Sequence, residues 1–293
     1  MSRVRRFVAP SGKSSRSRFH VHSKETSVMH TFNGKVALIT GGGTGIGAAV
    51  ARKFVEAGGR VVLLGRRREP LDAVAKPLGA AAIAVAGDAA DAHDVRRALD
   101  DARAAFGSVD VLVANAGGHG VGSALDTDDA SWAQSTRVNL DTAFVCAREL
   151  LPELIERRGS IVILSSLAGH FAGPNVVGYV TTKHALIGLM RSLARDYGRC
   201  GVRVNAVCPG WVRTAMADEQ MDALRDAHGL ATREDAYRLV TRDVPLGRPA
   251  EPDEVADTVL YLASPHASMI TGTSLLVDGG ASAVDLPTIE FAR

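Results

Sequence analysis

The chain has 293 residues, of which 46% are hydrophobic and 23% charged, with a formal net charge of +2. This composition is ordinary for a globular protein, and no apolar run reaches the ~18 residues that a membrane span requires. The three cysteines form no C-x-x-C pair and the nine histidines form no metal-binding pattern, so we expect a reduced, cytoplasmic protein without a metal site.

The first 33 residues differ in composition from the rest. They hold seven basic residues and one acid, a net +6, which leaves about −4 for the remaining 260 residues. Such a segment cannot bury a core, so a disordered basic tail is expected over 1–33. Its function is open between a targeting segment, an arm for nucleic acid or membrane, and an upstream-start artefact with Met29 as the native first residue. The acidic body favours neither nucleic acid nor membrane as a partner.

Short apolar runs alternate with longer amphipathic stretches from residue 35 onward. The predicted strands are 35–40, 60–65, 81–87, 109–115, 159–166, 202–210 and 274–280, and the predicted helices lie near 45–58, 69–77, 91–106, 128–157, 175–199 and 252–263. Continuous apolar strands are typical of a parallel sheet buried on both faces. We therefore predict an α/β fold over 34–293: a single Rossmann-type doubly wound parallel sheet of about seven strands, with helices on both faces.

A glycine-rich loop joins the first predicted strand to the first predicted helix. Glycines let the backbone approach a pyrophosphate, and the helix N-terminus supplies N–H donors. The sequence therefore predicts dinucleotide binding at this loop, with the cofactor-binding residues Thr40, Gly41, Gly43, Thr44, Gly45, Ile46 and Gly47.

The end of the second strand indicates which dinucleotide is bound. An acid at this position would bind the 2′-hydroxyl of NAD, but the chain has Gly65 followed by three arginines. Arg66 can hold a 2′-phosphate with two hydrogen bonds. We therefore expect NADP(H), with NAD(H) as the alternative because Arg66 alone does not exclude it.

Two further strand ends are candidate cofactor contacts. Asp88, followed by Ala89, ends the third strand, where its carboxylate could hydrogen-bond adenine. Asn115, Ala116 and Gly117 end the fourth strand with small residues at the edge where a cofactor must lie close to the backbone.

Tyr179 and Lys183 are the candidates for proton transfer. Residues four apart on a helix are neighbours, and a cation near a phenol lowers its pKa from ~10 toward the range of a general acid or base. Ser166 closes the fifth strand, where its hydroxyl can donate to a substrate carbonyl. Asn139 lies in the long helical stretch after the fourth strand.

The order and spacing of these motifs, together with Pro209-Gly210 and Thr214, resemble the short-chain dehydrogenase/reductase family over residues 34 to about 281. The segment 245–280 further resembles 3-oxoacyl-(acyl carrier protein) reductase-like members. The resemblance implies hydride transfer between a nicotinamide cofactor and a carbonyl or secondary alcohol, and a homotetramer or homodimer.

The resemblance also implies a role for each matched residue. Tyr179 would be the general acid/base, and Lys183 would lower its pKa and hold the nicotinamide ribose. Ser166 would polarise the carbonyl, and Asn139 would hold a water of the proton relay. The residues implied at the nicotinamide end of the cofactor are Pro209, Gly210, Val212 and Thr214.

The substrate side is less defined by sequence. A helical lid is expected near 211–247, and small-molecule carbonyl or alcohol substrates are expected beneath it. The candidate lining residues are His119, His170, Phe171, Trp211 and Met216, each of which could equally pack as an ordinary loop residue.

Several functions are compatible with this pattern. The first is an NADP(H)-dependent ketone reductase or alcohol dehydrogenase, including a 3-oxoacyl-thioester type. The alternatives are an NAD-dependent alcohol dehydrogenase and a non-catalytic dinucleotide-binding regulator. The regulator is disfavoured because Ser166, Tyr179 and Lys183 are all present.

Overall fold

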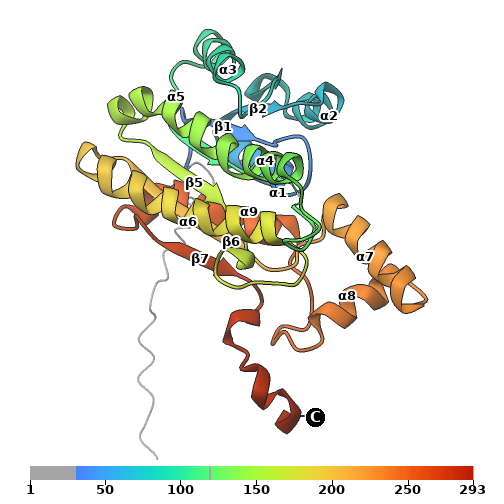
Figure 1. The fold of residues 1–293 in the computed structure, drawn as a ribbon. Helices are drawn as coiled ribbons and strands as arrows, with labels where there is room; N and C mark the ends of the chain where they lie inside the picture. Colours follow the sequence, from blue (N-terminus) through green and yellow to red (C-terminus); the bar gives the residue numbers. More distant parts are fainter. Residues whose placement is uncertain (1–30, 119, 293) are drawn as a thin grey trace, which may run out of the picture.

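The computed structural model describes residues 31–118 and 120–292, and within them a single seven-stranded sheet forms the centre of the molecule (Figure 1). All neighbouring strands are parallel, in the order β3-β2-β1-β4-β5-β6-β7, which confirms the predicted Rossmann-type fold. The strands are β1 (Val36–Thr40), β2 (Arg60–Gly65), β3 (Ala82–Ala86), β4 (Val111–Ala114), β5 (Ser160–Leu164), β6 (Arg203–Pro209) and β7 (Ser274–Val277).

Helices cover both faces of the sheet. The main ones are α1 (Gly45–Glu56), α2 (Arg68–Leu78), α3 (Ala92–Ala105), α4 (Asp129–Thr136), α5 (Thr142–Arg157), α6 (Val177–Tyr197), α7 (Ala215–His228), α8 (Arg233–Thr241) and α9 (Pro252–Ala263). One apolar core joins α3, α5 and α6 to one face of the sheet, and a second joins α1, α2 and α9 to the other.

Burial on both faces explains the continuous apolar strands. In β1, Leu38 belongs to the first core, whereas Ala37 and Ile39 belong to the second. Successive side chains of a strand point to opposite faces, so every position of a sandwiched strand must be apolar.

The structured body begins before residue 34, the boundary predicted from composition. Phe32 is only 3% exposed and stacks on Phe54 of α1 with ring centroids 4.2 Å apart. Its backbone N–H also donates to the Ala57 carbonyl. The predicted tail is therefore wrong for residues 31–33, and its remaining part, 1–30, lies outside the described residues.

The predicted long helix over 128–157 is not one regular helix. A π-helical turn, Arg137–Asp141, separates α4 from α5. The predicted lid contains two helices, α7 and α8, which lie beside each other and apart from the sheet (Figure 1). Within the described part of the chain, no helix has the length and apolar character needed to cross a membrane.

Candidate active site

The glycine loop after β1 is packed so closely that side chains cannot be accommodated. Gly41 and Gly45 adopt positive φ values of 64° and 51°, which favour glycine. A Cβ at Gly47 would lie 2.7 Å from Asn115 Nδ2, and one at Gly41 would lie 2.9 Å from the same atom. The loop runs directly into the N-terminus of α1, so it fits the cradle that a dinucleotide pyrophosphate requires.

The other predicted loop residues have different surroundings. Gly43 lies against α2, where a Cβ would come within 3.0 Å of the Leu71 nitrogen. Thr44 is exposed at the N-cap position of α1, and partly buried Ile46 packs against the second core.

Thr40 holds the turn at the end of β4. Its side chain is buried, and its Oγ1 accepts hydrogen bonds from the backbone N–H groups of Asn115 (3.0 Å) and Ala116 (2.9 Å). In return, Asn115 Nδ2 donates to the carbonyls of Thr40 (3.0 Å) and Gly41 (3.2 Å). The hydroxyl of Thr40 therefore positions the Asn115–Gly117 turn against the glycine loop. Its contact with a cofactor stays a prediction.

The two residues predicted to bind the adenosine end of the cofactor differ in whether their side chains already have partners within the protein. Arg66 is exposed beyond β2, and within the described part of the chain no hydrogen bond or ion pair engages it. Asp88 is already engaged: Oδ2 pairs with Arg137 Nη2 at 2.7 Å, and Oδ1 accepts from the Ala90 N–H at 2.9 Å. An adenine amino group would have to share these oxygens. Ala89, predicted together with Asp88, is buried.

The four predicted catalytic residues converge at the carboxyl edge of the sheet. The side chains of Tyr179 and Ser166 are hydrogen-bonded, and Lys183 Nζ lies 5.6 Å from the centroid of the tyrosine ring. The Cβ position of Gly117 lies 3.5 Å from Lys183 Nζ and 3.2 Å from Asn139 Oδ1. The absence of a side chain at residue 117 thus leaves the lysine and asparagine beside the turn that follows β4.

Burial controls the pKa values of the tyrosine and the lysine. Burial raises the pKa of the Tyr179 phenol, and the hydrogen bond from Ser166 opposes this. Burial also lowers the pKa of Lys183 to about 8. The predicted lowering of the tyrosine pKa by Lys183 is not seen; Lys183 Nζ instead donates to the Leu164 carbonyl at 2.9 Å. That acceptor is a backbone group, which the sequence pattern could not identify.

Asn139 is fixed by the π-helical turn. It is completely buried, its Nδ2 donates to the Ser135 carbonyl (2.9 Å), and its Oδ1 accepts from the Gly118 N–H (3.0 Å). The turn thus aims this side chain at the loop that leaves β4. The π-turn is only five residues long, too short for the spacing of apolar residues to distinguish it from an α-helix.

The loop after Gly117 lies directly against the N-terminus of α6. The Tyr179 N–H donates to the Gly120 carbonyl (3.3 Å), and the Val177 N–H donates to the Gly122 carbonyl (3.2 Å). A Cβ at Gly120 would lie 2.6 Å from the Tyr179 nitrogen. Glycine at position 120 therefore determines how close the loop comes to the tyrosine.

The segment after β6 approaches the glycine loop from the opposite side. The Gly210 N–H donates to Val277 of β7 (3.0 Å), next to Pro209 at the end of β6. Thr214, the N-cap of α7, lies 3.1 Å (Cγ2) from the Cβ position of Gly45. Val212 is buried and forms a bridge with Ala250, so its side chain belongs to the core.

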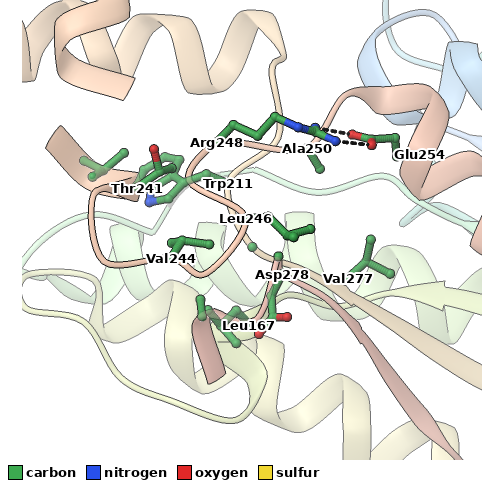
Figure 2. A pocket seen from close by; sticks show the side chains of 14 residues that line it. Leu167, Trp211, Thr241, Val244, Leu246, Arg248, Ala250, Glu254, Val277 and Asp278 are labelled. Carbon is green, nitrogen blue, oxygen red and sulfur yellow. Dashed lines mark hydrogen bonds and ion pairs between the residues drawn. The ribbon is translucent and has the colours of Figure 1, made fainter. Parts of the chain in front are cut away.

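A cavity of about 270 Å³ lies between the lid and the carboxyl ends of β6 and β7 (Figure 2). Trp211 lies in its wall beside Thr241, and Leu167, the neighbour of Ser166, lies opposite. The other predicted substrate residues do not line it: His170, Phe171 and Met216 are exposed, and His119 lies outside the described residues.

Comparisons with known proteins identify the relatives of this chain. Residues 41–282 match the family model described as enoyl-(acyl carrier protein) reductase. The chain is 47% identical to protein MoaE of Klebsiella aerogenes over 88% of this chain and 99% of that one. It is 37% identical to meso-2,3-butanediol dehydrogenase of Serratia marcescens, over 87% and 97%. The structure of L-sorbose reductase from Gluconobacter frateurii, complexed with NADPH and L-sorbose, is similar with a TM-score of 0.82, at 29% identity over 88% of this chain and all of that chain.

Proposed function

Because this chain belongs to the short-chain dehydrogenase/reductase family, whose members oxidise alcohols or reduce ketones, we propose that it transfers hydride between NADP(H) and a small ketone or secondary alcohol. The observation that carries the proposal is the convergence of Ser166, Tyr179 and Lys183 beside the Asn115–Gly117 turn, which packs against the glycine loop.

The residues present divide the reaction between them. Bound nicotinamide would supply or accept the hydride. Tyr179 Oη gives its proton to the carbonyl oxygen or takes it from the alcohol, and the Ser166 hydroxyl orients the same oxygen. Lys183, with a pKa of about 8, is mostly protonated at neutral pH and places a positive charge beside the phenol. Asn139 holds the loop at Gly118 and leaves part of its amide for a relay water.

NADP(H) is proposed over NAD(H) because of Arg66. Its guanidinium is exposed at the end of β2 and free of ion pairs within the described chain, as a 2′-phosphate would require. Similarity to an NADPH-bound sorbose reductase supports the same choice. A diol or sugar-like ketone is proposed as substrate because meso-2,3-butanediol dehydrogenase and L-sorbose reductase are among the similar proteins.

Turnover tests the reaction. Purified protein is mixed with NADPH and a panel that includes acetoin, L-sorbose and simple ketones, and absorbance at the nicotinamide band is followed. We expect at least one substrate to be reduced, and Tyr179→Phe to abolish turnover while retaining cofactor binding. Binding of neither NADPH nor NADH would contradict the proposal, as would turnover that survives in Tyr179→Phe.

Cofactor titrations test the NADP(H) preference. Arg66→Ala should weaken NADPH binding about 10- to 100-fold, the effect of losing a hydrogen bond between charged groups, and leave NADH binding nearly unchanged. Arg67→Ala is the matched control, since Arg67 is an equally exposed neighbour. An equal loss of affinity for both cofactors, or tighter NADH binding by the unmodified protein, would contradict the choice of NADP(H).

A further inference from the structure

The lid folds around a small core of its own. Ala217 and Met221 of α7 pack against Ala236 and Tyr237 of α8, and this cluster is separate from the two cores on the sheet. The Tyr237 hydroxyl also donates to Asp218 Oδ1 at 2.8 Å, which ties the two helices together. The two helices are therefore held to each other by their own contacts, and the segments that connect them to the body determine where the pair lies.

The segment 211–214 connects β6 to α7, and each of its residues contacts another part of the molecule. Trp211 lies in the wall of the cavity, Val212 bridges to Ala250, and Thr214 reaches the glycine loop at Gly45. Any displacement of this segment would thus move a cavity wall and a predicted cofactor contact together. The residue between Val212 and Thr214 is Arg213.

Arg213 contacts both the lid and the body. Its Nη2 pairs with Glu234 of α8 at 2.8 Å, and its Nε pairs with Glu251, at the start of α9, at 3.2 Å. Its guanidinium carbon lies 4.7 Å from the centroid of the Tyr237 ring, within cation–π distance. Its backbone N–H donates to the Ala250 carbonyl at 2.9 Å. One side chain therefore joins the lid core, the N-terminus of α9 and the entry segment.

We propose that Arg213 is a positioning residue that holds the lid against the body and thereby places Thr214 on the glycine loop and Trp211 at the cavity. The proposal rests on the proposed function, because its kinetic consequence concerns that reaction. One carboxylate belongs to the lid and the other to the body, so neutralising Arg213 removes the ion-pair link between α8 and α9. It also removes the contact with the Tyr237 ring, while the apolar contacts among Ala217, Met221 and Ala236 stay in place. Arg213 touches neither cofactor nor substrate in this scheme.

Tryptophan fluorescence tests the positioning directly. The chain has two tryptophans, so Trp132→Phe leaves Trp211 as the only one. In that background, Arg213→Gln should raise the acrylamide quenching constant of Trp211 about two-fold. The matched control is Arg225→Gln, because its partners, Asp222 and Asp226, all lie in α7. It should leave the quenching constant unchanged.

Kinetics provide the second readout. Arg213→Gln should raise KM for both NADPH and the ketone about five-fold, as expected for losing two partly exposed ion pairs and a ring contact, with kcat changed less than two-fold. Arg213→Lys should give KM values between those of the unmodified protein and Arg213→Gln. Glu234→Gln should also raise KM, and its altered side chain is half exposed. The KM of the unmodified protein should rise with salt more steeply than that of Arg213→Gln.

Two outcomes separate this proposal from the proposed function. If Arg213→Gln and Glu234→Gln match Arg225→Gln in quenching, the positioning role is wrong, whatever the activity. If the unmodified protein reduces no ketone but the quenching constants change as expected, the proposed reaction fails while the role of Arg213 stands. Loss of kcat with unchanged KM would overturn the positioning role, because it would place Arg213 in the chemical step.

Discussion

Replacing Thr40 with valine tests the hydrogen bonds that hold the Asn115–Gly117 turn. Valine has nearly the same shape as threonine but offers no acceptor to the N–H groups of Asn115 and Ala116. The Ala116 N–H loses its bond outright, whereas the Asn115 N–H retains the Val113 carbonyl at 3.1 Å. A buried donor without a partner costs ~1–3 kcal/mol, so one full and one partial loss should total about 2–4 kcal/mol.

Urea denaturation followed by circular dichroism measures this loss, and the thermal midpoint should fall by roughly 3–7 °C. Thr40→Ser is the control because it keeps the hydroxyl and loses one buried methyl, at about 1 kcal/mol. NADPH affinity should fall in Thr40→Val and be largely retained in Thr40→Ser. A valine variant as stable as the serine variant would refute the assignment of this hydroxyl as the acceptor for the turn.

Three other substitutions give distinct expectations. Gly120→Ala would place a Cβ 2.6 Å from the Tyr179 nitrogen. Since a displacement of a catalytic group by ~1 Å can cost about 100-fold in rate, kcat/KM should fall about 100-fold. Unchanged kinetics would contradict the close contact. Gly188→Ala on α6 meets no atom within 4 Å and should instead raise the free energy of unfolding by about 0.5–1 kcal/mol in urea denaturation; a loss of stability would be the contrary result. Folding lowers the pKa of Lys183 from 10.5 to about 8, so the unfolded chain binds more protons between these values. The free energy of unfolding should therefore rise with pH relative to Lys183→Met, by up to about 3 kcal/mol from pH 8 to 10.5. A pH-independent difference would show that folding does not lower the pKa of Lys183.

The sheet and the cluster of site residues could be predicted because each depends on residue types at fixed spacing. Strand β2 was predicted at 60–65 and is observed at Arg60–Gly65, since its apolar run is bounded by Arg60 and Gly65. Parallel strands bring their carboxyl ends to one edge, so the strand ends alone indicated that Ser166 would lie at the same edge of the sheet as the glycine loop.

What could not be predicted depends on backbone groups and distant partners. The carbonyls of Leu164 and Ser135 fix Lys183 and Asn139, but every residue has a carbonyl, so sequence does not distinguish them. The tail boundary was wrong because the partner of Phe32 is Phe54, which only the folded chain brings alongside.

The junction of β1 with β4 has a consequence for how the chain folds. Strands β1 to β3 occupy residues 36–86 and β4 to β7 occupy 111–277, so each half of the sheet pairs within its own sequence. In the sheet, β1 and β4 pair at three positions, from Ala37 with Val111 to Ile39 with Val113, whereas β1 and β2 pair at five. Pairing between strands that are far apart in the sequence, such as β1 and β4, forms slowly. A ligand that binds only after these strands have paired stabilises the paired state by mass action. Because the glycine loop and the Asn115–Gly117 turn stand at the end of this junction, a dinucleotide lying across them would stabilise the pairing of β1 with β4.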